Sequence, residues 1–137
     1  MSKIDRQKST QDSIIPASEW QEGQNRRLRG DRLEIYFPLT LSLSDGSPLH
    51  GYAEAVNLSW AGLLLETNLI LNEGETLQME FILPQTQTAI HTSAKVVRRT
   101  NHPKIPEFNL VGVLFLEMDV NHRRMISGYV LERLPTA

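Results

Sequence analysis

Residues 33–43 read LEIYFPLTLSL, with an apolar side chain at every odd-numbered position. This period of two is typical of a β-strand with one face toward a core and the other toward solvent. Pro38 interrupts the pattern. Because proline has no backbone N–H, we expect the strand to lie at a sheet edge or to bend there. Asp45-Gly46 follows at once and predicts a hairpin turn.

The rest of the chain predicts five more strands and one terminal helix. Apolar alternation and turn residues place the strands at residues 51–56, 63–66, 77–83, 89–99 and 108–118. Four apolar residues then recur at helical spacing: Ile126, Tyr129, Val130 and Leu134. Asp119 or Asn121 can cap this helix, and Pro135 ends it. The pattern predicts an all-β fold with a terminal helix, namely a six-stranded antiparallel β-barrel plugged by that helix.

Composition limits the classes of function. The chain has 137 residues, a formal net charge of −2 and no cysteine. It therefore lacks a general positive coat, a disulfide scaffold, a thiol nucleophile and a cysteine-based zinc site. The histidines are widely separated, so we expect no metal site. No GxSxG, Walker or HExxH motif is present, which predicts a non-enzymatic protein without catalytic residues or cofactors.

The N-terminal region differs from the rest. Residues 1–24 are polar and lack sustained periodicity, so we expect a flexible segment before a domain spanning residues 25–137. This region has no signal-peptide pattern, and nowhere does an apolar run approach membrane-spanning length. These features predict a soluble cytoplasmic protein without membrane insertion.

A cluster of arginines precedes the first predicted strand. It lies within NRRLRGDR, residues 25–32, and comprises Arg26, Arg27, Arg29 and Arg32. The planar guanidinium fork suits phosphate oxygens, the O6 and N7 acceptors of guanine, and stacking on a base. The alternative is a solvated linker whose arginines pair with nearby glutamates.

A second motif, Asn57-x-Ser59-x-x-Gly62, stands between the second and third predicted strands. Asn and Ser side chains bond their own backbone and shape tight turns, and Gly62 permits a positive φ or a close approach. On its own this pattern is better explained as a hairpin turn. Its Trp60 either lines a site or packs into the core, and we favour the core.

Together the two motifs resemble the PilZ domain family, which pairs an RxxxR segment with a [DN]xSxxG turn. The resemblance extends over residues 26–134 and includes FPLTLSLSDG, AKVVRR, VGVLFLEMD and NHRRMISGYVLERL. It implies a six-stranded barrel that binds the bacterial second messenger cyclic di-GMP. It further implies that Asn57 bonds a guanine edge, that Ser59 lies by the phosphate or base, and that Gly62 allows the close turn. The arginines would bracket guanine and phosphate.

The arginine spacing departs from the family pattern, because no two arginines here are four residues apart. Aligning the strand places the second arginine at Arg32 and Leu28 at the first position, with Arg27 and Arg29 on either side. Some PilZ-like domains without these arginines act as protein-binding adaptors. Arg98 and Arg99, at the end of the fifth predicted strand, are lesser candidates for positive charge at the barrel rim, the alternative being a solvated strand end.

Three hypotheses follow. The favoured one is a cyclic di-GMP receptor that changes its N-terminal conformation on binding and signals through an unidentified protein partner. The second is a degenerate PilZ adaptor of the motility or type IV pilus type that binds only protein. The third is a barrel that binds single-stranded nucleic acid. The negative net charge and the lack of aromatic residues interspersed with basic ones speak against a nucleic acid polymer.

Overall fold

The computed structural model describes residues 2–3, 6–7 and 32–134. The chain divides into two units, residues 1–31 and 32–137. In the first unit, β1 (Ser2–Lys3) and β2 (Arg6–Gln7) pair in parallel. The flexible segment predicted for residues 1–24 otherwise lies outside the described residues, as do Arg26, Arg27 and Arg29.

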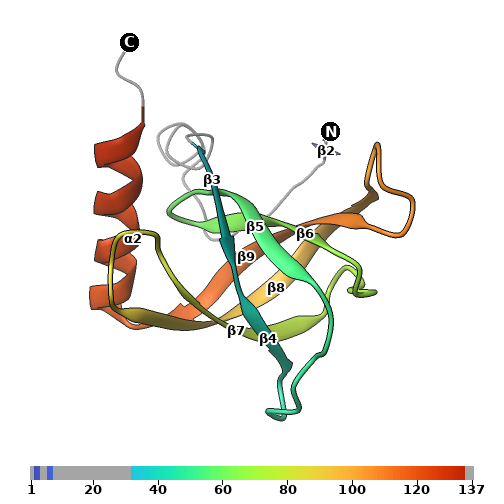
Figure 1. Cartoon of the computed structure of the whole chain (residues 1–137), viewed down its shortest axis with the longest axis horizontal. Helices are drawn as coiled ribbons and strands as arrows, with labels where there is room; N and C mark the ends of the chain where they lie inside the picture. Colours follow the sequence, from blue (N-terminus) through green and yellow to red (C-terminus); the bar gives the residue numbers. More distant parts are fainter. Residues whose placement is uncertain (1, 4–5, 8–31, 135–137) are drawn as a thin grey trace. The chain divides into compact units, whose positions relative to one another are not determined.

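The second unit is one curled antiparallel sheet followed by a helix (Figure 1). Its elements are β3 (Leu33–Pro38), β4 (Thr40–Leu43), β5 (Ala53–Leu58), β6 (Gly62–Thr67), β7 (Thr76–Ile82), β8 (Ala89–Asn101), β9 (Asn109–Met118) and α2 (Val120–Arg133). The strand order is β3-β5-β6-β9-β8-β7-β4. The predicted fold class is confirmed.

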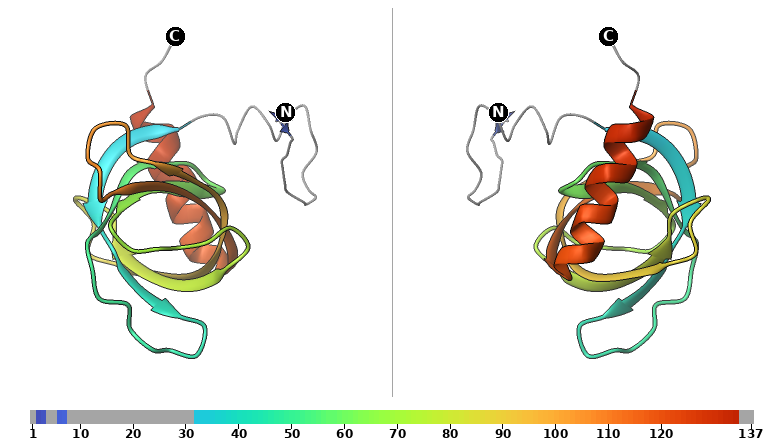
Figure 2. Two further views of the ribbon diagram at one scale, coloured as in Figure 1. Left: turned by 90° about the vertical axis from the view of Figure 1, so that its right-hand side faces the viewer. Right: turned by 90° about the vertical axis from the view of Figure 1, so that its left-hand side faces the viewer.

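The two edges of this sheet are consecutive in the chain. Pro38, at the end of β3, pairs with Glu54 of β5, whereas Thr40, at the start of β4, pairs with Glu80 of β7. The chain therefore bends at Leu39 and changes partners, so that one segment lines both edges of the curled sheet (Figure 2). The bend predicted at Pro38 is confirmed. It also explains why the sheet has seven strands where six were predicted, since the first predicted strand is β3 and β4 together.

Side chains from each of the seven strands of this sheet fill the interior. Side chains that are almost fully buried include Phe37, Leu41, Leu65, Leu77, Met79, Ile90, Ala94, Val96 and Val111. The rings of Phe37 and Phe81 lie 5.2 Å apart, which connects the bent strand to β7. Leu43 continues the alternation in sequence but is 40% exposed, because β4 ends there and the turn through Gly46 begins. Gly46 has a φ of +92°, as a tight Asp-Gly turn requires.

The helix α2 packs against the interior of the sheet (Figure 2). Asp119 caps it, since its carboxylate accepts a 2.7 Å hydrogen bond from the backbone N–H of Asn121. Ile126, Tyr129 and Val130 are buried, and the Tyr129 hydroxyl donates to the carbonyl oxygen of Pro84 over 2.9 Å. The helix ends at Arg133, two residues before Pro135. In the part of the chain that the structure describes, no helix is long and apolar enough to span a membrane.

Candidate functional site

The pairing of β3 with β5 brings residues of the two sequence motifs into contact. Glu34 pairs with Asn57 in this ladder, so Arg32, just before β3, lies next to Asn57. A guanidinium nitrogen of Arg32 donates a 3.2 Å hydrogen bond to Asn57 Oδ1. Arg32 is exposed and Asn57 is half-buried. A cation and an amide are thus held together at the surface of the barrel, in an arrangement that suits an anionic ligand with polar edges.

Asn57 lies within a strand rather than in the turn where the sequence placed it. The second predicted strand, residues 51–56, is observed as β5, Ala53–Leu58, and the turn begins at Ser59. The reason is that Leu58 still pairs with Leu63 of β6, which extends the ladder past Asn57. Asn57 pairs with Leu64, and because Leu58 and Leu63 point into the core, the Asn57 side chain lies on the outer face.

Ser59 closes the turn between β5 and β6. Its backbone N–H donates to the Gly62 carbonyl oxygen over 2.8 Å. Its hydroxyl oxygen lies 3.3 Å from the Ala61 nitrogen and 3.2 Å from the Gly62 nitrogen, and so accepts from both N–H groups. Ser59 is only 1% exposed. Its hydroxyl is therefore used inside the turn, where it fixes the end of the strand that carries Asn57.

Gly62 is required by the packing of β6 against β9. A Cβ atom at this position would lie 2.0 Å from the carbonyl oxygen of Val113, closer than any side chain tolerates. Beside it, the Phe115 N–H donates to the Ala61 carbonyl oxygen over 2.9 Å. Of the two reasons for glycine that the sequence offered, positive φ and close approach, the structure contains a close approach to the chain's own backbone.

A row of four residues crosses the outer face of the sheet from Asn57. Asn57 pairs with Leu64 of β6, Leu64 with Gly112 of β9, and Gly112 with Arg98 of β8. Residues paired in this way share one face of a sheet. The row thus has polar groups at its two ends and an apolar middle in which Gly112 has no side chain. We call Asn57, Leu64, Gly112 and Arg98 the outer row.

The two arginines that end the fifth predicted strand lie on opposite faces. Val96 pairs with Val113 and Arg98 with Gly112, so Val97 is an extra residue that forms a bulge. Arg98 consequently faces outward and is exposed. Arg99 pairs with Val111, whose side chain is in the core. The Nε atom of Arg99 is buried and has no hydrogen-bond partner among the residues that the structure describes. Only Arg98 belongs to the outer row.

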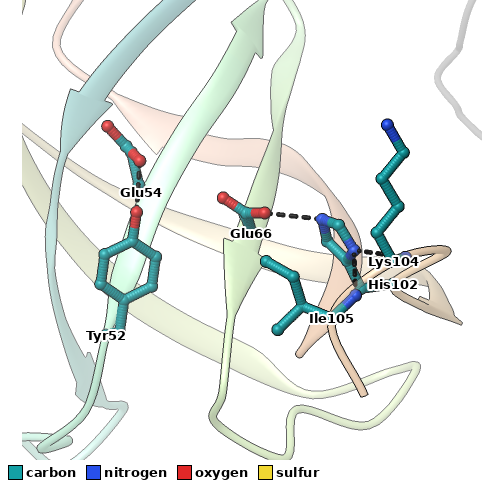
Figure 3. Close-up of polar contacts among 6 residues, drawn as sticks. All are labelled: Tyr52, Glu54, Glu66, His102, Lys104 and Ile105. Atoms are coloured by element: carbon teal, nitrogen blue, oxygen red, sulfur yellow. Dashed lines mark hydrogen bonds and ion pairs between the residues drawn. The ribbon is translucent and has the colours of Figure 1, made fainter. Parts of the chain in front are cut away.

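An acidic row lies beside the outer row, two residues further along β6. Glu54 of β5 pairs with Glu66 of β6. The Tyr52 hydroxyl donates to Glu54, and this hydrogen bond raises the pKa of Tyr52 to about 12, with smaller effects from burial and from Glu66 (Figure 3). Two residues are separated by about 7 Å along a strand, so these carboxylates disfavour an anion on their side. They set a boundary to the surface on which an anionic ligand is stabilised.

Glu66 also holds the loop after β8. Its carboxylate lies 2.7 Å from Nε2 of His102 (Figure 3). Nδ1 of His102 accepts 3.0 Å hydrogen bonds from the backbone N–H groups of Lys104 and Ile105. The two backbone donors require a bare Nδ1, which leaves the ring proton on Nε2, where it is donated to Glu66. This loop histidine has a structural role that its position in the sequence did not indicate.

Trp60 lies between the hydrophobic core and the solvent. It is half-buried and is not one of the residues that form the hydrophobic core, although the sequence favoured core packing. Its indole Nε1 is buried and finds no hydrogen-bond partner within residues 32–134. Within the described residues, no three His, Asp or Glu side chains come together in a group that could hold a metal ion.

Comparison with known proteins identifies a family. The PilZ domain model matches residues 24–132. A search of curated proteins found no matching sequence.

Several solved structures share the fold. The Bacillus subtilis inhibitor of motility, MotI/DgrA, aligns with a TM-score of 0.64 and 21% identity over 74% of this chain and 48% of that one. YcgR from Escherichia coli, solved in complex with c-di-GMP, aligns with a TM-score of 0.56 and 19% identity over 74% and 43% of the two chains. The PilZ domain of CeSA from a cellulose-synthesizing bacterium gives 0.52 and 13% over 74% and 95%. The chain thus spans about half the length of the first two proteins.

Proposed function

The chain belongs to the PilZ domain family, and we propose that it is a cyclic di-GMP receptor without enzymatic activity that acts in the cytoplasm. The observation that supports this proposal is the hydrogen bond between Arg32 and Asn57. These residues come from the two motifs that the family combines, and the bond joins them at one surface of the barrel.

The chemistry of these groups fits the nucleotide. Cyclic di-GMP is a dianion with two guanines, so it requires cationic forks for phosphate and polar groups for the guanine edge. Asn57 accepts from Arg32 through Oδ1, which leaves its Nδ2 group to donate to guanine O6 or N7. Ser59 and Gly62 contribute by holding the turn that positions Asn57. We propose that Arg26, Arg27 and Arg29 supply the remaining positive charge.

The proposed signal is a change in the N-terminal unit. Arg32 is the first residue of the second unit, and the segment with the other three arginines precedes it directly. Binding of a dianion neutralises this cluster of positive charges and favours an ordered arrangement of residues 25–31. A protein partner that recognises the ordered segment then reads the nucleotide.

Isothermal titration calorimetry with purified protein tests the proposal. We expect cyclic di-GMP to bind, and we expect Arg32→Ala and Asn57→Ala each to weaken binding. Absence of binding heat at high-micromolar nucleotide in a folded sample would reject the receptor function. Hydrogen exchange of residues 1–31 with and without nucleotide tests the proposed signal, because an ordered segment exchanges more slowly.

The alternative is a PilZ adaptor that binds a protein partner without nucleotide. The observation in its favour is Leu28, which stands where the family's first arginine is expected. The adaptor function predicts that Arg27→Ala and Arg32→Ala leave partner binding unchanged and that the titration produces no heat. The receptor function predicts the opposite result in both measurements.

A further inference from the structure

We infer that Arg98 is a further nucleotide-binding residue, located on a strand that carries neither of the two sequence motifs. This inference rests on the proposed function and extends its site from β5 across the sheet to β8. The starting point is the outer row, in which continuous strand pairing places Arg98 on the same face as Asn57.

The dimensions of the outer row suit a ligand with two planar bases. Asn57 and Arg98 are separated by three strand spacings, which amounts to about 14 Å between their backbones. Leu64 and Gly112 lie between them. A ligand with two aromatic bases can lie over this apolar middle while its polar edges meet Arg32 and Asn57 at one end and Arg98 at the other.

The side chain of Arg98 lies next to Gly112, where no side chain covers the backbone. A Cβ atom built at Gly112 would lie 3.7 Å from the Cβ atom and 4.0 Å from the Nε atom of Arg98, so the arginine side chain extends over the glycine. The Nε atom, which is part of the guanidinium plane, therefore lies beside the middle of the row. A guanidinium plane over an open backbone is suited both to stack on a base and to bond a phosphate.

Arg98 is also available for a ligand. It is exposed, and its guanidinium has no hydrogen bond or ion pair with any residue in the range 32–134. The carboxylates of the neighbouring acidic row are committed elsewhere, Glu66 to His102 and Glu54 to Tyr52. The bulge at Val97 turns Arg98 outward. In a regular strand without the bulge, Arg99 would face outward in its place.

Calorimetric titration of cyclic di-GMP into five proteins tests the inference: wild type, Arg32→Ala, Arg98→Ala, Arg98→Lys and Arg124→Ala. We expect Arg98→Ala to weaken binding about tenfold or more, as loss of a charge-assisted contact does. Arg98→Lys keeps the charge but loses the fork, so we expect it to restore only part of the affinity. Arg124 lies exposed on α2, and its replacement removes the same charge from an element that is not part of the outer row. We expect Arg124→Ala to stay within twofold of wild type.

The results distinguish failure of the inference from failure of the function. If wild type binds and Arg32→Ala weakens binding while Arg98→Ala stays within twofold of wild type, the inference is wrong and the receptor function stands. Equal losses in Arg98→Ala and Arg124→Ala would also overturn it, because they indicate an effect of net charge. If folded wild type does not bind at all, both proposals fail. Circular dichroism spectra of the five proteins confirm that each is folded.

Discussion

Arg32 donates a hydrogen bond to Asn57 across 25 positions of sequence, and the antiparallel pairing of β3 with β5 is what brings them together. The two motifs are therefore parts of one structural unit rather than independent patches. Any change in this ladder affects both.

The effects of Arg32→Ala and Asn57→Ala on cyclic di-GMP affinity are expected to be non-additive. Because the two side chains touch, each substitution also removes part of what positions the other. Contacting residues commonly show coupling energies of about 0.5–3 kcal/mol. Calorimetry on both single variants and the double variant measures this coupling. Strict additivity, within about 0.3 kcal/mol, would show that the bond has no part in ligand binding.

Ser59→Ala is expected to lower both stability and nucleotide affinity. The substitution leaves the N–H groups of Ala61 and Gly62 without the hydroxyl that they contact in a buried turn. An unsatisfied buried polar group costs about 1–3 kcal/mol. Urea unfolding measures the first effect, and titration at a temperature where the variant is folded measures the second. Ser42→Ala, at a half-buried position on β4, is a matched control for loss of a hydroxyl, because the Ser42 side chain makes no hydrogen bond within residues 32–134. A Ser59→Ala protein as stable as wild type would contradict the role assigned to this turn.

Gly62 of β6 and Gly112 of β9 lie on paired strands, and replacing them with alanine is expected to change the free energy of unfolding in opposite directions. At Gly62 the new Cβ atom would meet the Val113 carbonyl oxygen at 2.0 Å, and the backbone cannot move aside without breaking the β6–β9 ladder. We expect a loss of about 3 kcal/mol or more, as for severe overpacking. At Gly112 the nearest atom to a new Cβ would be 3.7 Å away, which is an ordinary contact. Because alanine suits a strand better than glycine, we expect Gly112→Ala to be slightly more stable than wild type.

Urea unfolding of the two alanine variants gives the comparison directly. A Gly62→Ala protein with the stability of Gly112→Ala would show that β6 and β9 are not packed as closely as described. The Gly112→Ala protein is also a probe of the proposed binding surface, because it adds a methyl group to the open middle of the outer row without disturbing the fold.

Titration of Tyr52 is expected near pH 12, above the ordinary tyrosine value of 10.0. The first cause is the hydrogen bond that its hydroxyl donates to Glu54. Because the folded-state pKa is raised, the stabilising contribution is present below pH 10 and is lost as the pH rises from 10 toward 12. Ultraviolet difference absorption of tyrosinate follows this titration.

Glu54→Gln is expected to move the Tyr52 titration back toward its ordinary pKa, since the carboxylate charge is removed. Glu34→Gln is the matched control. Glu34 accepts from Tyr36 and raises the pKa of that tyrosine instead, so this variant should leave Tyr52 unchanged. If Glu54→Gln leaves every tyrosine titration where it was, the pairing of Tyr52 with Glu54 is wrong.

The fold was predictable from the sequence because its signals are local. The alternation of residues 33–43 and the helical spacing after Asp119 depend only on residues close in sequence. Proline itself predicts the bend at Pro38, because it lacks a backbone N–H. The candidate site was less predictable, because it depends on strand register. The bulge at Val97 decides that Arg98, and not Arg99, faces outward, and nothing in AKVVRR indicates it.

The same limit applies to the motif residues. The sequence indicated that Gly62 needs room, but its neighbour Val113 lies on a strand far along the chain. The burial of Ser59 likewise follows from the pairing of Leu58 with Leu63 and not from the motif itself. The roles of Arg26, Arg27 and Arg29 remain predictions from the sequence.

The bent segment of β3 and β4 has a consequence for how the protein behaves at high concentration. Open sheets risk joining edge to edge with other molecules, because their outer strands carry unpaired N–H and C=O groups. Here the outer strands have only six and four residues. The bend at Pro38 places them at opposite edges of the sheet. Part of the free side of β4 is also occupied, since the Leu49 N–H donates to the Leu41 carbonyl oxygen over 3.0 Å. The bend at Pro38 thereby also limits the length of edge that is open to intermolecular strand pairing.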